Sequence, residues 1–372
     1  MSVGKLGFGT MRLPLLDKED PTSIDLEQYK VMADTFLERG FTYFDTAYPY
    51  HRQKSEEAFK EAVAKRHPRE SYTIADKMPV FLVKSNEDYE RIFNEQLERC
   101  GVDHFDYYLL HNLGKDRYPD TEKYGGFEFI AKKKEEGKIS HIGFSFHDEA
   151  SLLDEILSKH PEIEFVQLQI NYLDWDSPVT QSGKCYETVV KHGKKVIVME
   201  PVKGGTLATL PDEAMKKFRD FYPDETVSPA SLAIRYAASL DNVMMVLSGM
   251  SAIDQLEDNT SYMQDFSPLN DEERKLIEEI TAIMNSSIKV PCTSCEYCME
   301  VCPMNINIPR YFGLLNLYAT TEQKSGLYYN RYAFNHGKAS DCLKCGLCEG
   351  NCPQHLPIRE YLEEFKALYE NE

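Results

Sequence analysis

Eight short apolar runs recur through the first 285 residues of the chain, and longer amphipathic stretches separate them. Runs that are apolar almost throughout are typical of parallel strands whose two faces are both covered. The runs are LGFGT (6–10), FTYFDTA (41–47), YTIADK (72–77), FDYYLLH (105–111), HIGFSF (141–146), FVQLQIN (165–171), VIVMEP (196–201) and VMMVLSG (243–249). Eight strands with intervening helices over about 250 residues predict an α/β fold, the (β/α)8 TIM barrel.

The stretches between the runs carry helix signals. Residues 25–40, 86–101 and 228–240 place apolar side chains at helical spacing. In the last of these, Ser228 can cap the helix and Pro229 suits its first turn. A doubly wound sheet would also alternate strands and helices, but no G-x-G-x-x-G follows an early run. We therefore expect a barrel.

Eight of the ten cysteines lie in the last quarter of the chain, in the runs PCTSCEYCMEVCP and DCLKCGLCEGNCP. Both runs follow C-x2-C-x2-C-x3-C-P, the spacing of bacterial ferredoxins, in which the fourth cysteine ligates the other [4Fe–4S] cluster. We therefore assign Cys292, Cys295, Cys298 and Cys352 to one cluster, and Cys342, Cys345, Cys348 and Cys302 to the other. Two zinc sites are the alternative, but zinc gives no reason for a third cysteine at this spacing.

The residues between the two cysteine runs place apolar and aromatic side chains at helical spacing, over 312–318 and 328–332. They predict an α-helical, two-cluster ferredoxin-like domain over 286–372, following a barrel over 1–285. Cys100 and Cys185 stand apart from the runs, and we expect them to be buried.

Composition excludes several classes of function. A formal charge of −19 opposes binding to nucleic acids. No stretch approaches about 20 consecutive apolar residues, so we expect no membrane span. The first residues lack the apolar core of an export signal. We expect the protein to work in the reducing cytoplasm, where cysteine clusters bind metals more often than they form disulfides.

Four polar side chains follow the second, third and fourth apolar runs: Asp45, Tyr50, Lys77 and His111. Each alone has an ordinary structural explanation, as a turn former or a core residue. Together they would meet at the carboxyl end of a barrel, where catalytic residues lie. A nearby ammonium favours the phenolate, so we expect Lys77 to lower the pKa of Tyr50 and make it a usable proton donor. An imidazole such as that of His111 can orient a carbonyl oxygen.

Through these residues the chain resembles the aldo-keto reductases over residues 3–285. The stretches that carry the resemblance are LGFGTMRLP, YFDTAYPY, IADK, YYLLH, GKISHIGFSFH and VMMVLSGMSAIDQLEDN, in this order. With its cysteine-rich end, the whole chain resembles the ferredoxin-fused branch of that superfamily, found in anaerobic microbes. The resemblance implies a tetrad with Tyr50 as general acid, and hydride transfer between NAD(H) or NADP(H) and a small carbonyl or alcohol substrate.

The resemblance also implies nucleotide contacts. They map onto Thr10, Met11, Ser145, Gln167, Met199, Pro201, Gly204, Gly249, Gln255, Asp258 and Asn259. Gly249 and Gln255 stand where many members place a lysine and an arginine for the 2′-phosphate of NADP, so we expect NADH to be favoured. Met199 stands where an aromatic ring usually covers the nicotinamide, and a thioether can still cover a ring face.

The two cofactors differ in the number of electrons they carry, because a nicotinamide moves two as a hydride and a [4Fe–4S] cluster moves one. We therefore expect a flavin that bridges them, or an external one-electron carrier such as ferredoxin. Two alternatives stay open: a regulatory or electron-transfer protein whose relic barrel docks a redox partner, and clusters that serve as structural staples. Residues 112–126 and 172–183, which include Trp175, should shape the substrate pocket, but they do not identify the substrate.

Overall fold

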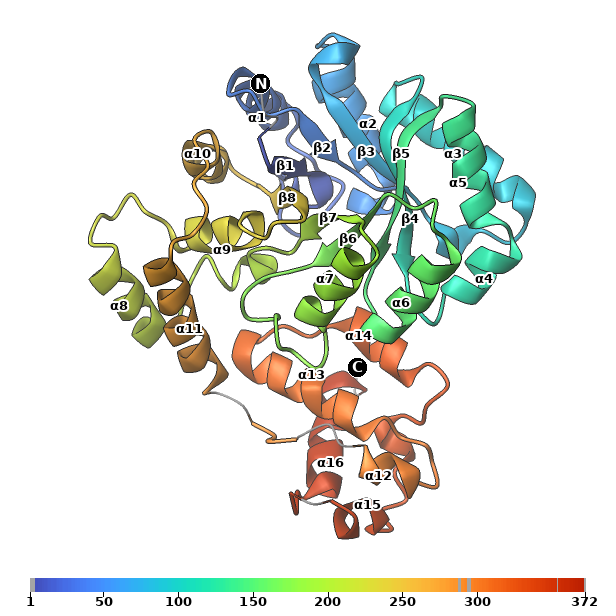
Figure 1. The fold of residues 1–372 in the computed structure, drawn as a ribbon, viewed down its shortest axis with the longest axis vertical. Helices are drawn as coiled ribbons and strands as arrows, with labels where there is room; N and C mark the ends of the chain where they lie inside the picture. The colour runs from blue at the N-terminus through green and yellow to red at the C-terminus, as the bar shows by residue number, and fades with distance from the viewer. Residues whose placement is uncertain (1–3, 287–288, 293–295, 353, 371–372) are drawn as a thin grey trace.

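The computed structural model describes residues 4–286, 289–292, 296–352 and 354–370. Within these residues, eight parallel strands pair in sequence order and β8 closes on β1 (Figure 1). The strands are β1 Leu6–Gly9, β2 Tyr43–Asp45, β3 Thr73–Met78, β4 Phe105–Leu113, β5 Ile139–Phe146, β6 Phe165–Gln169, β7 Lys195–Met199 and β8 Val243–Gly249. The predicted (β/α)8 barrel is confirmed, and each strand falls on one of the eight apolar runs.

Helices surround this barrel and bury one face against it. They are α1 Leu26–Glu38, α2 Ser55–Phe59, α3 Asn86–Cys100, α4 Tyr118–Lys123, α5 Gly126–Glu135, α6 Ala150–Lys159, α7 Ser182–Lys191, α8 Asp212–Phe221, α9 Pro229–Ala238, α10 Ile253–Met263 and α11 Asp271–Asn285. The side chain of Ser228 accepts a hydrogen bond from the backbone N–H of Ser231, which confirms the predicted cap of α9. Cys100 and Cys185 are buried, as expected.

Strand β4 extends two residues beyond the predicted end at His111. Asn112 adopts a left-handed conformation with a φ of 60°, and the register with β5 shifts between Leu110 and Leu113. Asparagine tolerates this conformation better than most residues do. The irregularity therefore lies at the carboxyl end of the barrel, directly after His111.

The cysteine-rich end of the chain is helical, as predicted. Its helices are α12 Tyr297–Glu300, α13 Ile308–Thr321, α14 Gly326–Ala333, α15 Leu347–Gly350 and α16 Ile358–Tyr369. They pack around a core of their own, in which the rings of Tyr311 and Phe365 stack with centroids 4.6 Å apart. We refer to this part as the cluster domain.

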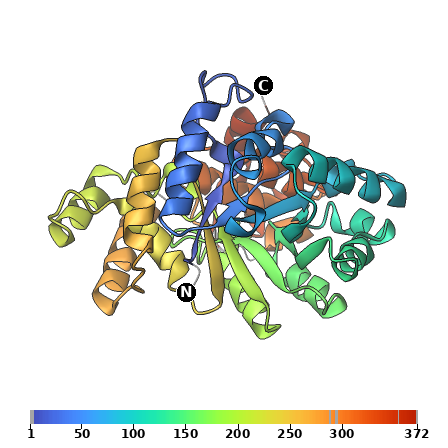
Figure 2. The ribbon, with the colours of Figure 1, turned by 90° about the horizontal axis from the view of Figure 1, so that it is seen from above.

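The cluster domain lies against the carboxyl end of the barrel, with α13 and α14 nearest to it (Figure 1). Seen from above, its orange and red elements lie behind the barrel (Figure 2). The Tyr328 hydroxyl on α14 donates to Oε1 of Gln169 at the end of β6 (3.2 Å), and the Tyr332 hydroxyl donates to the carbonyl of Val179 (2.7 Å). On α13, Arg310 pairs with Glu149, which follows β5. The domain therefore covers part of the end at which barrel chemistry is expected.

No helix in the described part of the chain is both long and apolar enough to cross a membrane.

Candidate active site

Three neighbouring strands bring the four predicted catalytic side chains together. Asp45 is the last residue of β2, Lys77 lies on β3, and His111 lies on β4. Nζ of Lys77 is 2.5 Å from Oδ1 of Asp45 and 3.5 Å from the Tyr50 hydroxyl. The rings of Tyr50 and His111 have centroids 6.1 Å apart. The predicted group thus forms one continuous set of contacts.

A left-handed turn positions Tyr50. The three residues after it, His51, Arg52 and Gln53, have φ values of 51°, 48° and 71°. Non-glycine residues adopt this conformation at a cost of roughly 1–2 kcal/mol each. The His51 ring offsets part of that cost, because its Nε2 accepts from the N–H of Leu13 (3.1 Å) and its Nδ1 lies 2.7 Å from the carbonyl of Pro21.

The ammonium of Lys77 is fully enclosed. Its exposed fraction is 0%, and besides Asp45 it donates to the carbonyl of Thr46 (2.7 Å). Burial, the largest single effect, works against the charged form, but Asp45, Tyr50 and Asp76 together outweigh it and hold the pKa of Lys77 above its usual value. Lys77 is therefore a fixed positive charge beside the phenol.

The expected fall in the pKa of Tyr50 does not occur. Burial raises the pKa of the phenol above its usual value, and the Lys77 ammonium offsets only part of that rise. Burial also lowers the pKa of His111 well below its usual value, and the Lys77 charge adds to that effect. Near neutral pH the site therefore holds a protonated phenol and a neutral imidazole, which are the forms that a proton donor and a hydrogen-bonding partner require.

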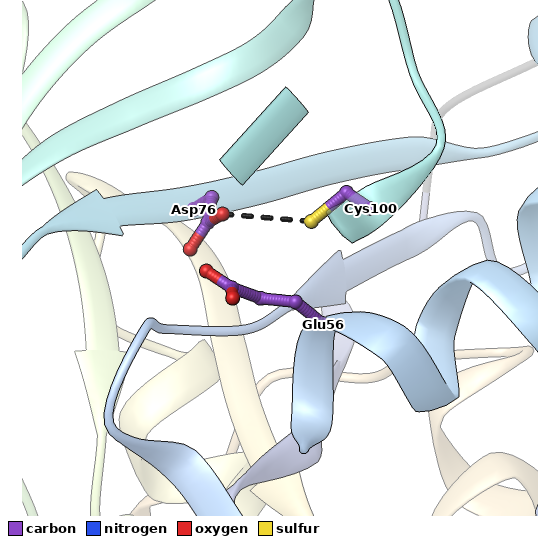
Figure 3. A group of neighbouring side chains, drawn as sticks. All are labelled: Glu56, Asp76 and Cys100. Atoms are coloured by element: carbon purple, nitrogen blue, oxygen red, sulfur yellow. Dashed lines mark hydrogen bonds between the residues drawn. The ribbon is translucent and has the colours of Figure 1, made fainter. Parts of the chain in front are cut away.

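Behind Lys77, on the outer side of β3, lies a buried group formed by Glu56, Asp76 and Cys100 (Figure 3). The carboxyl groups of Glu56 and Asp76 share a hydrogen bond, and the Cys100 thiol donates to Oδ2 of Asp76 (3.5 Å). Burial raises the pKa of Glu56 to about 6 and that of Asp76 well above its usual value. Burial therefore favours the protonated forms of both carboxyl groups, and the Arg99 guanidinium, 2.7 Å from Oε2 of Glu56, opposes this for Glu56.

This buried group holds the backbone of Lys77 from both sides. Oδ1 of Asp76 accepts from the N–H of Lys77 (2.8 Å). Nε2 of Gln96 donates to the carbonyl of Lys77 (3.1 Å) and to Oε1 of Glu56 (3.1 Å). The position of the lysine is thus fixed by polar contacts outside the barrel as well as within it.

Three predicted nucleotide residues lie on β5, β6 and β7, with Ser145 and Met199 near the ends of their strands and Gln167 in the middle of β6. Ser145 accepts from the N–H of Asn112 (2.7 Å), and Nε2 of Gln167 lies 3.5 Å from the sulfur of Met199. Oε1 of Gln167 is buried without a hydrogen-bond partner in the described structure. An unpaired amide oxygen in a buried position fits the carboxamide of a nicotinamide, because that group supplies an N–H donor.

Two other predicted nucleotide residues use their side chains within the protein. The Thr10 hydroxyl donates to the carbonyl of Asp45 (2.9 Å). The Asn259 amide donates to Ser248 (2.7 Å) and accepts from Tyr262 (2.7 Å). These two side chains support the barrel in this structure, and they offer a nucleotide little beyond backbone contacts.

The remaining nucleotide positions surround the ends of β7 and β8. Met11 is exposed, Pro201 is buried, and Gly204 adopts a φ of 63°. Oε1 of Gln255 accepts from the N–H of Ser251, and Asp258 accepts from the Ser228 hydroxyl.

Sequence reasoning missed Arg12. A Cβ added to Gly249 would lie 3.2–3.3 Å from the side chain of Arg12, and one added to Gly204 would lie 3.5 Å from its Nη2. Among the described residues, Arg12 forms no ion pair. Lys203, the other nearby cation, is buried and pairs with Asp174 at 2.5 Å. Arg12 follows the predicted contacts Thr10 and Met11, and that adjacency could have identified it.

The cysteines gather around two hollows in the pairing predicted from their spacing. One hollow, with a volume of about 330 Å³, is lined by Cys302, Cys342, Cys345 and Cys348. The other, of about 310 Å³, is lined by Cys292, Cys298 and Cys352. The predicted ligand Cys295 lies outside the described residues. Cysteine thiols that converge in this crossed pattern are the donor sets that two [4Fe–4S] clusters require.

Sequence reasoning also did not identify two side chains beside His111. The Phe81 ring lies 6.2 Å from that of His111, and the Arg117 guanidinium lies over Phe81 at 5.0 Å. Arg117 falls within the loop 112–126 that was expected to shape the substrate pocket. Trp175, in the other such loop, packs instead against Tyr186 and Tyr236.

Two family models match the chain. One, described as the aldo/keto reductase family, matches residues 5–282, and one described as a 4Fe-4S dicluster domain matches residues 291–356. Among curated proteins, an uncharacterized oxidoreductase of Schizosaccharomyces pombe is 26% identical over 270 residues, which cover 70% of this chain and 81% of that protein. An aldo-keto reductase of Mycolicibacterium vanbaalenii is 29% identical over 227 residues, covering 60% and 73%.

Solved structures share the barrel. An aldo-keto reductase from Bacillus halodurans in its holo form is 26% identical with a TM-score of 0.60, and the match covers 75% of this chain and 92% of that one. An aldo/keto reductase from Klebsiella pneumoniae in complex with NADP and acetate gives a TM-score of 0.59 at 19% identity, with coverage of 75% and 92%. At 19% identity, the similarity to the Klebsiella pneumoniae structure is a similarity of fold alone.

Proposed function

This chain belongs to the aldo/keto reductase family and carries a C-terminal 4Fe-4S dicluster domain, and we propose that it interconverts a carbonyl compound and its alcohol at the barrel mouth with a nicotinamide nucleotide. The proposal includes a second activity, the exchange of single electrons through two [4Fe–4S] clusters. The barrel and the cluster domain would then act as two redox centres of one oxidoreductase.

One observation carries the first part of the proposal. The ammonium of Lys77 contacts both the Asp45 carboxylate (2.5 Å) and the Tyr50 hydroxyl (3.5 Å), beside the imidazole of His111. A phenol that touches a buried cation can release its proton to a developing alkoxide, since the cation stabilises the phenolate left behind. This combination of a phenol, an ammonium and an imidazole is suited to proton transfer to and from an oxygen atom.

Each residue has a role that follows from its contacts. Tyr50 donates its proton to the carbonyl oxygen, and Lys77 stabilises the phenolate that forms. Asp45 holds the ammonium in place. His111, neutral because burial lowers its pKa, hydrogen-bonds the carbonyl oxygen and orients it towards Tyr50. In the oxidising direction the same groups accept the proton from an alcohol.

The residues that would hold the nucleotide lie on β5, β6 and β7, the strands that follow β4 around the barrel. Gln167 and Ser145 present amide and hydroxyl groups to the carboxamide, and Met199 covers a face of the ring. When bound, the nicotinamide supplies the hydride that reaches the carbonyl carbon. The positions that would meet the 2′-phosphate, 249 and 255, carry no charge.

The Tyr50→Phe variant tests the carbonyl chemistry. It removes one hydroxyl, so we expect folding and nucleotide binding to persist while carbonyl reduction falls by about 100-fold or more, the usual contribution of a general acid. The measurements are steady-state reduction of a panel of aldehydes and ketones, and nucleotide binding by fluorescence. A variant with full turnover would show that another group donates the proton.

The second activity rests on the two cysteine-lined hollows. The crossed sets of thiols would hold the clusters, which transfer one electron each, and the acceptor or donor would be an external carrier such as a ferredoxin, or a flavin. The test is anaerobic EPR of the purified protein after addition of NADH, then of reduced ferredoxin, each with and without flavin. We expect cluster signals that respond to the one-electron carrier. Clusters that no reductant alters would support a purely structural role.

A further inference from the structure

We propose that the substrate of the barrel carries a carboxylate, and that Arg117 binds this group at the barrel mouth, on the far side of the Phe81 ring from the reacting carbonyl. The inference rests on the proposed function, because it assigns the substrate class of the same site. It concerns specificity rather than the chemical step, which Tyr50 and His111 would carry out for any carbonyl compound.

Arg117 lies at the barrel mouth. It follows β4 in the loop that leads to α4, and its guanidinium rests on the Phe81 ring, which follows β3. The Phe81 ring lies 6.2 Å from His111, which in turn lies 6.1 Å from Tyr50. One aromatic side chain therefore separates the guanidinium from the group that would hold the carbonyl oxygen.

The guanidinium of Arg117 has spare hydrogen-bonding capacity. Nη1 donates to the carbonyl of Asn112 at 3.3 Å, and Nε lies 3.4 Å from Oδ2 of Asp116. Nη2 has no hydrogen-bond partner within the described part of the chain, and 23% of the side chain is exposed. The contact with the Phe81 ring at 5.0 Å and the hydrogen bond to Asn112 restrain the guanidinium, while Nη2 remains available for an anion.

The nearby carboxylates are bound mainly by another arginine. Arg331 enters from α14 of the cluster domain and is fully buried. Its Nη2 donates to Oδ1 of Asp116 at 3.0 Å, and its Nε lies 3.6 Å from Asp148. Because Arg331 forms the shorter contact with Asp116, that carboxylate neutralises Arg117 only in part. The cluster domain thereby helps to leave Arg117 available.

The negative charge of the chain makes an available arginine at the barrel mouth a candidate site for an anionic substrate. The protein has a formal charge of −19, so most of its surface repels anions. A half-buried arginine is costly to desolvate unless an anion pairs with it. A carboxylate on the substrate would meet that requirement at the barrel mouth, in the bidentate geometry that guanidinium favours.

The carboxylate takes no part in bond changes. A hydride adds to the carbonyl carbon, the proton of Tyr50 passes to the oxygen, and the carboxylate keeps its charge throughout. The substrate class is therefore an oxo-carboxylate, reduced to the corresponding hydroxy-carboxylate. The loss of charge-assisted hydrogen bonds from Arg117 should cost about 10- to 100-fold in kcat/KM.

The test compares each of several ω-oxo carboxylates, beginning with succinic semialdehyde, with its methyl ester. We expect the wild-type kcat/KM for at least one acid to exceed that for its ester by about 10- to 100-fold. In Arg117→Met, which keeps apolar contact with Phe81, we expect this acid-to-ester ratio to approach unity. Arg117→Lys should give an intermediate ratio, because it keeps the charge and loses the planar fork.

Binding of succinate, measured by calorimetry, provides a readout that does not depend on turnover. We expect Arg117→Met to weaken it by tenfold or more. Lys84→Met is the matched control, since it removes a positive charge from an exposed loop residue that follows the same strand, β3. It should leave both the ratio and succinate binding unchanged. Equal use of every acid and its ester by the wild type, or an unchanged ratio in Arg117→Met, would overturn the inference. If neither acids nor esters are reduced, the proposed function fails, and succinate binding alone decides the role of Arg117.

Discussion

Replacement of Lys77 by methionine keeps an unbranched side chain as far as Cε and removes the ammonium group. In the wild type that group contacts Oδ1 of Asp45 at 2.5 Å, the carbonyl of Thr46 at 2.7 Å and the Tyr50 hydroxyl at 3.5 Å. Oδ2 of Asp45 already lacks a hydrogen-bond partner among the described residues. The variant therefore leaves a buried carboxylate without its counter-ion.

The expected cost follows from that burial. Asp45 is 2% exposed, and removal of one partner from a buried ion pair costs about 3–5 kcal/mol of unfolding free energy. In the variant the pKa of Asp45 should rise, so the folded protein keeps a proton that the unfolded chain releases. The deficit in stability should therefore grow as the pH rises above the usual pKa of an aspartate. Carbonyl reduction should fall by about 100-fold or more, because the phenolate of Tyr50 loses its stabilising charge.

Urea unfolding at several pH values and steady-state reduction test both effects. The double variant Asp45→Asn/Lys77→Met should recover much of the lost stability, since no buried charge is left unpaired, but it should remain inactive. Lys65→Met, which breaks an exposed ion pair with Glu61, is the control and should change neither property. A Lys77→Met protein as stable and as active as the wild type would refute the assigned role of the ammonium.

Further predictions concern the other buried groups and both cofactors. Burial raises the pKa of Asp76, so its contribution to stability is present at low pH and is lost as the pH rises, by up to about 1.4 kcal/mol per pH unit. Asp76→Asn should flatten the dependence of unfolding free energy on pH, measured by urea unfolding between pH 5 and 8. The same dependence in both proteins would contradict this prediction. NADH should bind at least as tightly as NADPH, as measured by titration with each nucleotide. If NADPH binds more tightly instead, loss of that preference in Arg12→Met would show that Arg12 binds the 2′-phosphate. Cys302→Ser and Cys348→Ser should each remove about half of the iron, and both should remove the same EPR signal. Cys352→Ser should remove the EPR signal of the other cluster. If each run of four cysteines held its own cluster, Cys302→Ser and Cys348→Ser would remove different signals.

The sequence predicted the barrel well because each strand is buried on both faces and is therefore apolar nearly throughout. The differences lie at strand ends, where burial changes within one residue. Strand β2 spans Tyr43–Asp45, shorter than its apolar run, and β4 continues past His111 because Asn112 takes a left-handed conformation. Side-chain apolarity does not encode these backbone details.

The contacts between the barrel and the cluster domain were beyond the reach of sequence patterns. Arg331 lies on a helix that was identified by its tyrosines, and a charged residue is expected at the surface. It is fully buried because Asn112, Asp116 and the carbonyl of His147, about 180 to 220 positions earlier in the chain, surround it. Nothing local in the sequence indicates such distant partners.

The candidate site was predicted in part. The positions of Asp45, Tyr50, Lys77 and His111 follow from strand ends, and their mutual contacts follow from the barrel. The direction of the Tyr50 pKa was wrong, because the effect of one neighbouring charge can be inferred from the sequence, whereas the depth of burial that outweighs it cannot. The importance of Arg117 likewise depends on which carboxylates Arg331 binds.

The most direct test of the account asks where the hydrogen on the product carbon comes from. The protein, with its clusters intact, is incubated anaerobically with a carbonyl substrate and NADH deuterated at the transferred position, and the alcohol is examined by mass spectrometry. Hydride transfer at the barrel mouth predicts that the product carries a single deuterium on the carbinol carbon. An alcohol without deuterium, formed from electrons delivered through the clusters and protons from water, would contradict the account.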